Sequence, residues 1–273
     1  MTIRYFMALV ALFALSVSCE KVIDININDA NPVPVIESYI ENDSTCYVLA
    51  TYTSNFFDNT SSPFISDAVI TIADDAGNSE QLNYQGDGVY RGSTVRGVIG
   101  RTYTLSVTID NNTYTANSKM PPLVPIDSFS VQSLSSFFGG GGGGNRPERY
   151  WVYVNYTDPA VVQNYYAVRT TYFDSSDTEQ GFVTDYRIAD DDLSNGISTR
   201  SFTTTNPFIS GDTLTTELAS LDRTTHFYFK TLEDALTGGF GSAAPSNPST
   251  NFSEGALGYF GAWSKETRVF VVP

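Results

Sequence analysis

The sequence predicts a mostly β protein, in which an N-terminal immunoglobulin-like β-sandwich is followed by a second β-rich domain with one helix. Apolar and polar residues alternate along many short segments, as they do in strands that bury one face. Turn-forming residues separate these segments at roughly the 8–12 residue spacing that is typical of a sandwich. The 17 Tyr and 18 Phe among the 273 residues also suit strands better than helices.

The chain begins MTIRYFMALVALFALSVSC, which has the pattern of a secretory signal peptide that ends at a cysteine. Arg4 is the only charged residue before Cys19, and residues 5–15 are all apolar. This run is shorter than the about 20 residues of a membrane-spanning helix. We expect a signal peptide at residues 1–18 and a diacylglycerol on the thiol of Cys19. The alternative is an ordinary signal peptide followed by an incidental cysteine, because Ser16 stands where lipoproteins usually carry leucine.

The composition argues against a nucleic-acid partner. The 30 acidic residues outnumber the 15 basic ones and give a net charge of −15, whereas nucleic acid binding requires basic patches. We interpret the excess of acid as a means of staying soluble. Only Cys19 and Cys46 are available for redox chemistry, and Cys46 lies in an alternating segment, where we expect a small buried apolar residue.

We expect the immunoglobulin-like domain to cover residues 19–122. Asn111 and Asn112 tolerate the positive φ of a tight turn, so TLSVTIDNNTYTANS is the clearest hairpin. The expected strands are 22–28, 33–40, 46–54, 68–73, 80–84, 88–92, 102–109 and 113–119. Three prolines in MPPLVP, at residues 120–125, cannot continue a central strand and mark the domain boundary.

The second β-rich domain is expected at residues 123–273. Six glycines at 139–144 form a surface loop, because the strand, lysine and helix of a phosphate-binding loop are missing around them. The expected strands are 127–134, 150–156, 165–173, 182–188, 197–203, 213–217, 256–263 and 267–272.

A helix is predicted over about residues 220–236. Its apolar stripe recurs at spacings of three and four, at Leu221, Thr225, Tyr228, Leu232 and Leu236. Ser220 is the expected N-cap, and the glycines at 238 and 239 supply a stop. The only histidine, His226, is expected to be solvated on a polar face with Asp222, Lys230 and Glu233.

The sequence contains no organised catalytic or metal-binding motif. A Ser-His-Asp triad would have to use His226, and no Gly-x-Ser-x-Gly elbow occurs. One histidine and two cysteines are too few for a zinc site built from these residues. We therefore expect a non-enzymatic protein with no cofactor and no metal. A hydrolase that uses two carboxylates is the alternative, because any two of the 30 acids at the right separation would suffice.

The aromatic residues Tyr259, Phe260 and Trp263, in GALGYFGAWS, are the candidate ligand contacts. Neighbouring glycines would let a ligand approach their rings closely. The competing interpretation, which we favour, is that these residues alternate along a terminal strand and fill the core.

Several stretches, taken together and in order, resemble the domain of unknown function 4249 family of Bacteroidota lipoproteins. They are CEKVIDI (19–25), SDAVITIADDAGN (66–78), GVY (88–90), GRTYTLSV (100–107), MPP (120–122), TDP (157–159), NYY (164–166) and GALGYFGA (255–262). The resemblance spans nearly the whole chain after the leader, and Ser16 and the glycine run depart from the usual pattern. The resemblance implies a function for one residue, Cys19, as the site of lipidation, and it implies no catalytic residue.

The resemblance implies a lipid-anchored protein of the outer membrane, on its periplasmic or cell-surface face. It also implies a TonB-dependent transporter as a neighbour, so we expect a binding or accessory module of a transporter or surface complex. A surface hydrolase and a structural or adhesive surface protein are the alternatives.

Overall fold

The computed structural model describes residues 31–54, 61–137, 147–160, 162–174, 181–237, 247–253 and 255–273. The predicted signal peptide at 1–18, Cys19, the strand expected at 22–28 and the glycine run at 139–144 lie outside these ranges. Pro32–Pro273 forms one compact unit. The protein is mostly β with sandwich packing and one main helix, so the predicted fold class is confirmed.

In chain order, the described elements of this unit are β1 (Pro34–Glu41), β2 (Thr45–Tyr52), β3 (Val69–Asp74), β4 (Ser79–Gln81), β5 (Asn83–Gly86), β6 (Val89–Arg96), β7 (Thr102–Ile109), β8 (Asn112–Lys119), β9 (Ser128–Ser133), α2 (Leu134–Phe137), β10 (Tyr150–Thr157), β11 (Tyr165–Asp174), β12 (Gly181–Asp190), β13 (Ser198–Phe202), β14 (Thr213–Leu221), α3 (Arg223–Thr237) and β15 (Leu257–Val271).

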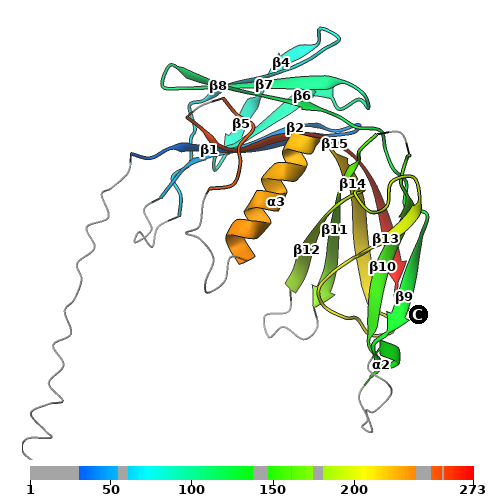
Figure 1. The fold of residues 1–273 in the computed structure, drawn as a ribbon. Helices are drawn as coiled ribbons and strands as arrows, with labels where there is room; N and C mark the ends of the chain where they lie inside the picture. The colour runs from blue at the N-terminus through cyan, green and yellow to red at the C-terminus, as the bar shows by residue number, and fades with distance from the viewer. Residues whose placement is uncertain are drawn as a thin grey trace, which may run out of the picture. The chain divides into compact units, whose positions relative to one another are not determined.

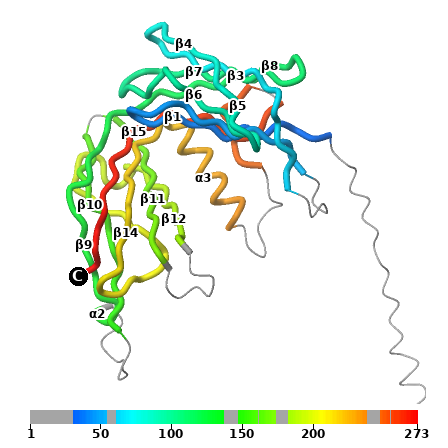
Figure 2. The backbone as a smooth tube through the Cα atoms, turned by 180° about the vertical axis from the view of Figure 1, so that it is seen from behind, coloured from blue at the N-terminus to red at the C-terminus, as the bar shows by residue number. Residues whose placement is uncertain are grey.

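The strands form three sheets (Figure 1). The main sheet has eight strands in the order β12-β11-β14-β15-β1-β2-β6-β5. A four-stranded sheet, β4-β3-β7-β8, and a three-stranded sheet, β13-β10-β9, complete the fold. Figures 1 and 2 show α3 on the side of the main sheet that is opposite to the two smaller sheets.

Both smaller sheets pack on the same face of the main sheet. Phe260 of β15 belongs to the cluster formed with the four-stranded sheet, and Phe270 of the same strand packs beside Phe129 of β9. These two β15 residues are an even number of positions apart on an uninterrupted strand, so their side chains share a face. The odd-numbered residues of β15 therefore point to the opposite face, where α3 lies.

Strands β1 and β15 pair in parallel and join the two ends of the described chain. Gly258 of β15 lies opposite Ile36 of β1, with a φ of +99°. A Cβ on Gly258 would lie 2.1 Å from the carbonyl oxygen of Ile36, so only glycine fits there. Because of this pairing, the main sheet contains strands from both sides of the boundary expected between residues 122 and 123.

Strand β15 is one strand of 15 residues, so the prediction of two strands, 256–263 and 267–272, is wrong at the break. Each of the polar residues between the two predicted strands has a partner or a buried position in the sheet. Ser264 is buried, Lys265 forms ion pairs with two glutamates, and the Glu266 carboxylate accepts the N–H of Ile126 at 2.7 Å.

The helix α3 begins at Arg223, and its N-cap is Asp222 instead of the expected Ser220. Strand β14 continues to Leu221, which pairs with Tyr165 of β11, so Ser220 belongs to the sheet. The Asp222 carboxylate accepts the N–H of Thr225 at 2.7 Å and the hydroxyl of Ser118 at 2.5 Å. The Ser118 oxygen in turn accepts the N–H of Ala262 at 2.7 Å, which ties the start of the helix to β8 and β15.

Replacing Gly258 with alanine is predicted to weaken the pairing of β1 with β15. Gly100→Ala is the matched control, because Gly100 has a similar positive φ of +88° but open space where the Cβ would lie. We expect both variants to lose about 1–3 kcal/mol from backbone strain, and Gly258→Ala to lose clearly more through its clash with Ile36. Urea denaturation measures both losses, and equal losses would show that the close approach at Gly258 is unimportant.

Asp74 is predicted to make the fold sensitive to acid. Burial raises the pKa of this carboxyl, but hydrogen bonds from Asn78, Arg101 and Ala76 outweigh burial and hold it below its usual value. Its contribution to stability is therefore complete above the unfolded pKa of about 3.9 and is lost as the pH falls through the lower folded value.

We expect Asp74→Asn to reduce the free energy of unfolding by about 1–3 kcal/mol at neutral pH. The difference from the wild type should shrink below about pH 4. Urea denaturation across this range measures the effect, and the exposed Asp87→Asn is the control. A constant difference at every pH would contradict the assignment to Asp74.

Candidate functional site

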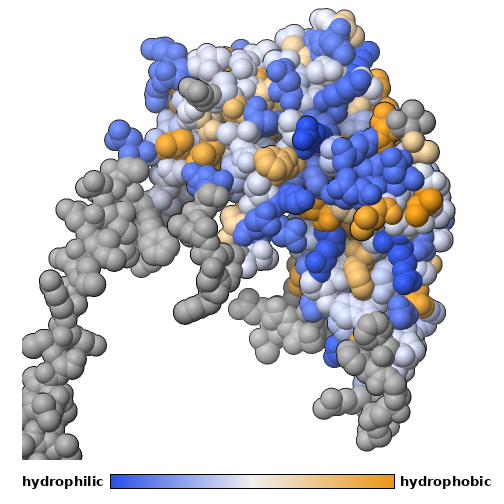
Figure 3. Space-filling model, viewed as in Figure 1, coloured by the Kyte–Doolittle hydropathy of each residue, from blue (hydrophilic) through white to orange (hydrophobic). Residues whose placement is uncertain are grey.

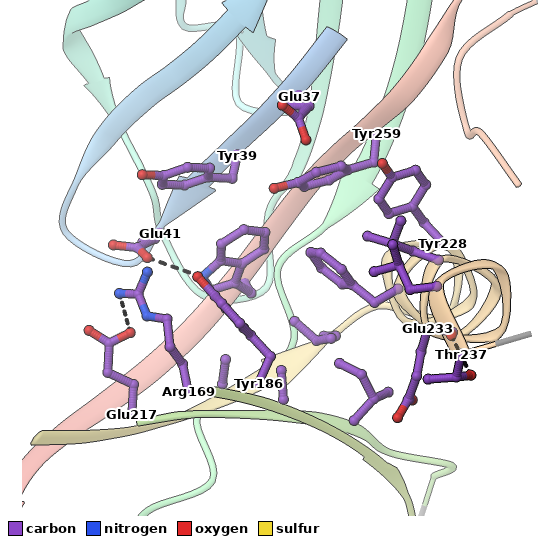
Figure 4. Close-up of a pocket in the computed structure, with 18 residues that line it drawn as sticks. Glu37, Tyr39, Glu41, Arg169, Tyr186, Glu217, Tyr228, Glu233, Thr237 and Tyr259 are labelled. Carbon is purple, nitrogen blue, oxygen red and sulfur yellow. Dashed lines mark hydrogen bonds and ion pairs between the residues drawn. The ribbon is translucent and has the colours of Figure 1, made fainter. Parts of the chain in front are cut away.

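A cleft of about 450 Å³ lies between α3 and the open face of the main sheet (Figure 4). Five strands supply its floor and one side: β1, β11, β12, β14 and β15. The helix supplies the other side. The described residues that line it are Glu37, Tyr39, Glu41, Ala167, Arg169, Tyr186, Ile188, Glu217, Ala219, Leu221, Tyr228, Phe229, Leu232, Glu233, Leu236, Thr237, Tyr259 and Trp263.

The alternation of β1 and β15 sets the order of side chains in this cleft. Glu37, Tyr39 and Glu41 are odd-numbered residues of β1, whose even-numbered neighbours are buried in the core. The parallel register places Glu37 beside Tyr259 and Glu41 beside Trp263. Acidic and aromatic side chains therefore lie in pairs across the two strands.

Gly261 makes room for stacked rings in the middle of the cleft. It lies opposite Tyr39 in the register, and a Cβ on it would lie 2.6 Å from the Cζ3 atom of Trp263. With no side chain there, the Trp263 and Tyr39 rings stack with centroids 5.0 Å apart and an interplanar angle of 21°. The row of side chains continues along the sheet. The ring centroids of Tyr47 and Tyr39 lie 5.1 Å apart, and the Cζ atom of Arg91 lies 4.8 Å from the ring centroid of Tyr47.

A second aromatic group joins the helix to β15. The ring centroids of Tyr228 and Phe229 lie 4.7 and 5.0 Å from the ring centroid of Tyr259. Burial raises the pKa of Tyr228 to about 12, and the negative charge of Glu37 adds to this effect. Burial and Glu37 also raise the pKa of Tyr259. Both phenols therefore stay protonated and neutral at physiological pH.

At the other end of the cleft, four charged residues form a network across four strands. The Nζ atom of Lys265 lies 3.0 Å from Oε2 of Glu41 and 3.0 Å from Oε1 of Glu217. Arg169 forms an ion pair with Glu217. Burial lowers the pKa of Arg169, but Glu217 more than offsets this, so the net shift is upward. The indole N–H of Trp263 also donates to Glu41, at 3.3 Å.

Glu37 differs from the acids of this network. Among the residues that the structure describes, it has no hydrogen-bond or ion-pair partner for its carboxylate. Glu37 is exposed to solvent, although the groups packed around it still raise the pKa of its carboxyl. Figure 4 shows this carboxylate at the edge of the group of lining side chains, above the rings of Tyr39 and Tyr259.

The three aromatic residues singled out from the sequence separate onto two faces. Phe260 is 0% exposed and fills the core, whereas Tyr259 and Trp263 are half-buried and line the cleft. Cys19 lies outside the described residues. Cys46 is 0% exposed, which agrees with the prediction of a small buried residue.

The prediction of a solvated His226 is wrong. This side chain is 5% exposed, and its ring centroid lies 4.8 Å from that of Tyr165 on β11. Burial lowers its pKa. The helical wheel placed it with polar neighbours, but α3 packs against β11 as well as β15, so a wider arc of the helix is covered than one apolar stripe requires.

Sequence reasoning missed Glu37, Tyr39 and the helix residues that complete the cleft. The segment ESYIE, at 37–41, carries the only local signal, because its odd positions hold acidic and aromatic residues on the face away from the core. Nothing local indicates that β15 is its neighbour. Within the described ranges, no group of three or more potential ligands among His, Cys, Asp and Glu is placed to hold a metal ion.

No helix in the described part of the chain is long and apolar enough to span a membrane. A comparison with curated proteins found no match. Comparison with protein families gave a match over residues 20–268, which is most of the chain and includes every described residue that lines the cleft. The chain therefore belongs to the family described as domain of unknown function DUF4249.

Proposed function

We propose that this protein is a lipid-anchored binding module of the outer membrane that holds a small ligand in the cleft between α3 and the main sheet. The observation that carries the proposal is the cleft itself. Its volume of about 450 Å³ falls in the range of ligand pockets. Like such pockets, it is lined mainly by aromatic and aliphatic side chains, with a few polar groups between them.

Binding fits this site better than catalysis does. The described lining residues include no histidine, cysteine or serine that would act as a nucleophile or base. Glu41 and Glu217 form ion pairs with Lys265, so their charges are compensated within the protein. Lining groups that are already paired orient a ligand more readily than they transfer protons.

A hydrolase with two carboxylates is the second candidate, because one observation favours it. Burial raises the pKa of Glu37, as a general acid requires, and Glu233 is the other lining acid without a cationic partner among the described residues. Such an enzyme would turn over a glycan, and its activity would be lost in both Glu37→Gln and Glu233→Gln.

We also propose the anchor and the partner. A diacylglycerol on Cys19 would hold the chain at the membrane, because each buried methylene contributes about 0.8 kcal/mol and two acyl chains suffice for stable anchoring. A TonB-dependent transporter is the proposed neighbour, and a structural or adhesive role is the alternative for a protein found without one.

Replacing Cys19 is predicted to release the protein from the membrane fraction. Cys46→Ala is the control, because it removes the other cysteine without touching the anchor. Mass spectrometry of the tagged wild type, captured after mild crosslinking, should find an acylated Cys19 and a transporter subunit. An unmodified N-terminus on a protein recovered alone would contradict both the anchor and the partner.

Tyr259→Ala is predicted to abolish small-molecule binding at the cleft. The change removes a ring that lies between Glu37 and the helix, whereas the control Tyr84→Ala removes a ring that is 43% exposed on β5, outside the cleft. Thermal-shift screening of a metabolite library should give hits that Tyr84→Ala retains and Tyr259→Ala loses. Hits that survive in both variants would place the binding site elsewhere.

A further inference from the structure

We propose that the cleft is specific for an organic cation, an ammonium group on an apolar body, and that Glu37 receives the positive charge. This inference rests on the proposed function of the cleft as a binding site and names the chemical class of its ligand.

The first argument is that the acidic residues Glu41 and Glu217 have cationic partners in the protein, whereas Glu37 has none among the described residues. Glu41 and Glu217 share Lys265, and Glu217 also pairs with Arg169. Glu37 is exposed and has no such partner among the described residues, and partial burial raises its pKa. A carboxylate that loses water without gaining a cation destabilises the empty protein, and a bound cation would remove this penalty.

The second argument is the aromatic surroundings of Glu37. Tyr39 lies on the same face of β1 as Glu37, and Tyr259 lies opposite Glu37 on β15. Tyr228 of the helix has its ring centroid 4.7 Å from that of Tyr259. The faces of such rings attract cations within about 6 Å of their centroids. The phenols nearest Glu37 stay neutral, so they attract a cation through their ring faces and leave Glu37 as the anion beside them.

The third argument is the charge balance of the lining. Four glutamates line the cleft, at positions 37, 41, 217 and 233, against the one cation Arg169. Even with Lys265 beside the network, the balance stays negative and disfavours an anionic ligand. Leu221, Leu232 and Ala219 also line the cleft and suit an apolar body.

The experiment uses Trp263 as the reporter. The chain has two tryptophans, and Trp151 lies outside the cleft on β10, so Trp151→Phe leaves Trp263 as the only indole. Four probes that share a six-carbon chain but differ in their head group are titrated against its fluorescence: the cations hexylammonium and hexyltrimethylammonium, the neutral 1-hexanol and the anion hexanoate. We expect both ammonium probes to bind at least about tenfold more tightly than the neutral and anionic ones.

The variant Glu37→Gln, in the same Trp151→Phe background, should weaken both ammonium probes by about tenfold and leave 1-hexanol unchanged. Asp67→Asn removes an exposed charge away from the cleft and should change nothing. Equal affinity for all four probes, or ammonium binding that survives Glu37→Gln, overturns the cation proposal while the cleft remains a binding site. If no probe changes the Trp263 emission, the proposed function of the cleft fails as well.

Discussion

The parallel pairing of β1 with β15 is the constraint on which the rest of the structure depends. Parallel neighbours need a long connection, and in this chain nearly all of the described residues provide it. The pairing brings Ile36 and Ile40 of β1 into one core with Phe260 and Ala262 of β15. On the opposite face, the same pairing brings the acids of β1 beside the aromatic rings of β15. The core and the cleft thus lie on opposite faces of the same pair of strands.

The cleft exists because a single helix cannot cover the open face of an eight-stranded sheet. Strands about 4.8 Å apart make a sheet about 34 Å wide, whereas a helix with its side chains is about 10–12 Å across. The part that α3 leaves uncovered must carry polar side chains or accept a partner. The surface in the view of Figure 3 is largely hydrophilic, with apolar side chains in small groups, while the uncovered part of the sheet face concentrates aromatic rings in the cleft.

Local sequence patterns predicted most strands, because alternation is a property of each strand by itself. The strand at 102–109 was predicted with its observed bounds. Prediction failed where the environment of a residue depends on contacts with distant parts of the chain. Lys265 falls in the gap between two predicted strands, but it lies within the continuous β15, where it forms ion pairs with Glu41 and Glu217. His226 looked solvated until β11 covered it. Sequence patterns did not predict the composition of the cleft for the same reason, since β1 comes from the opposite end of the described chain from α3 and β15.

The way in which the helix is held bears on how the cleft binds. Asp222 ties the first turn of α3 to Ser118, and the Thr231 hydroxyl accepts the N–H of Ser249 at 2.9 Å further along the helix. On the sheet side, Lys265 bridges the acids of β1 and β14. Both sides of the cleft are therefore fixed by contacts that need no ligand. A ligand would lose little free energy in ordering such a site, so a modest number of ring and charge contacts is enough for specific binding.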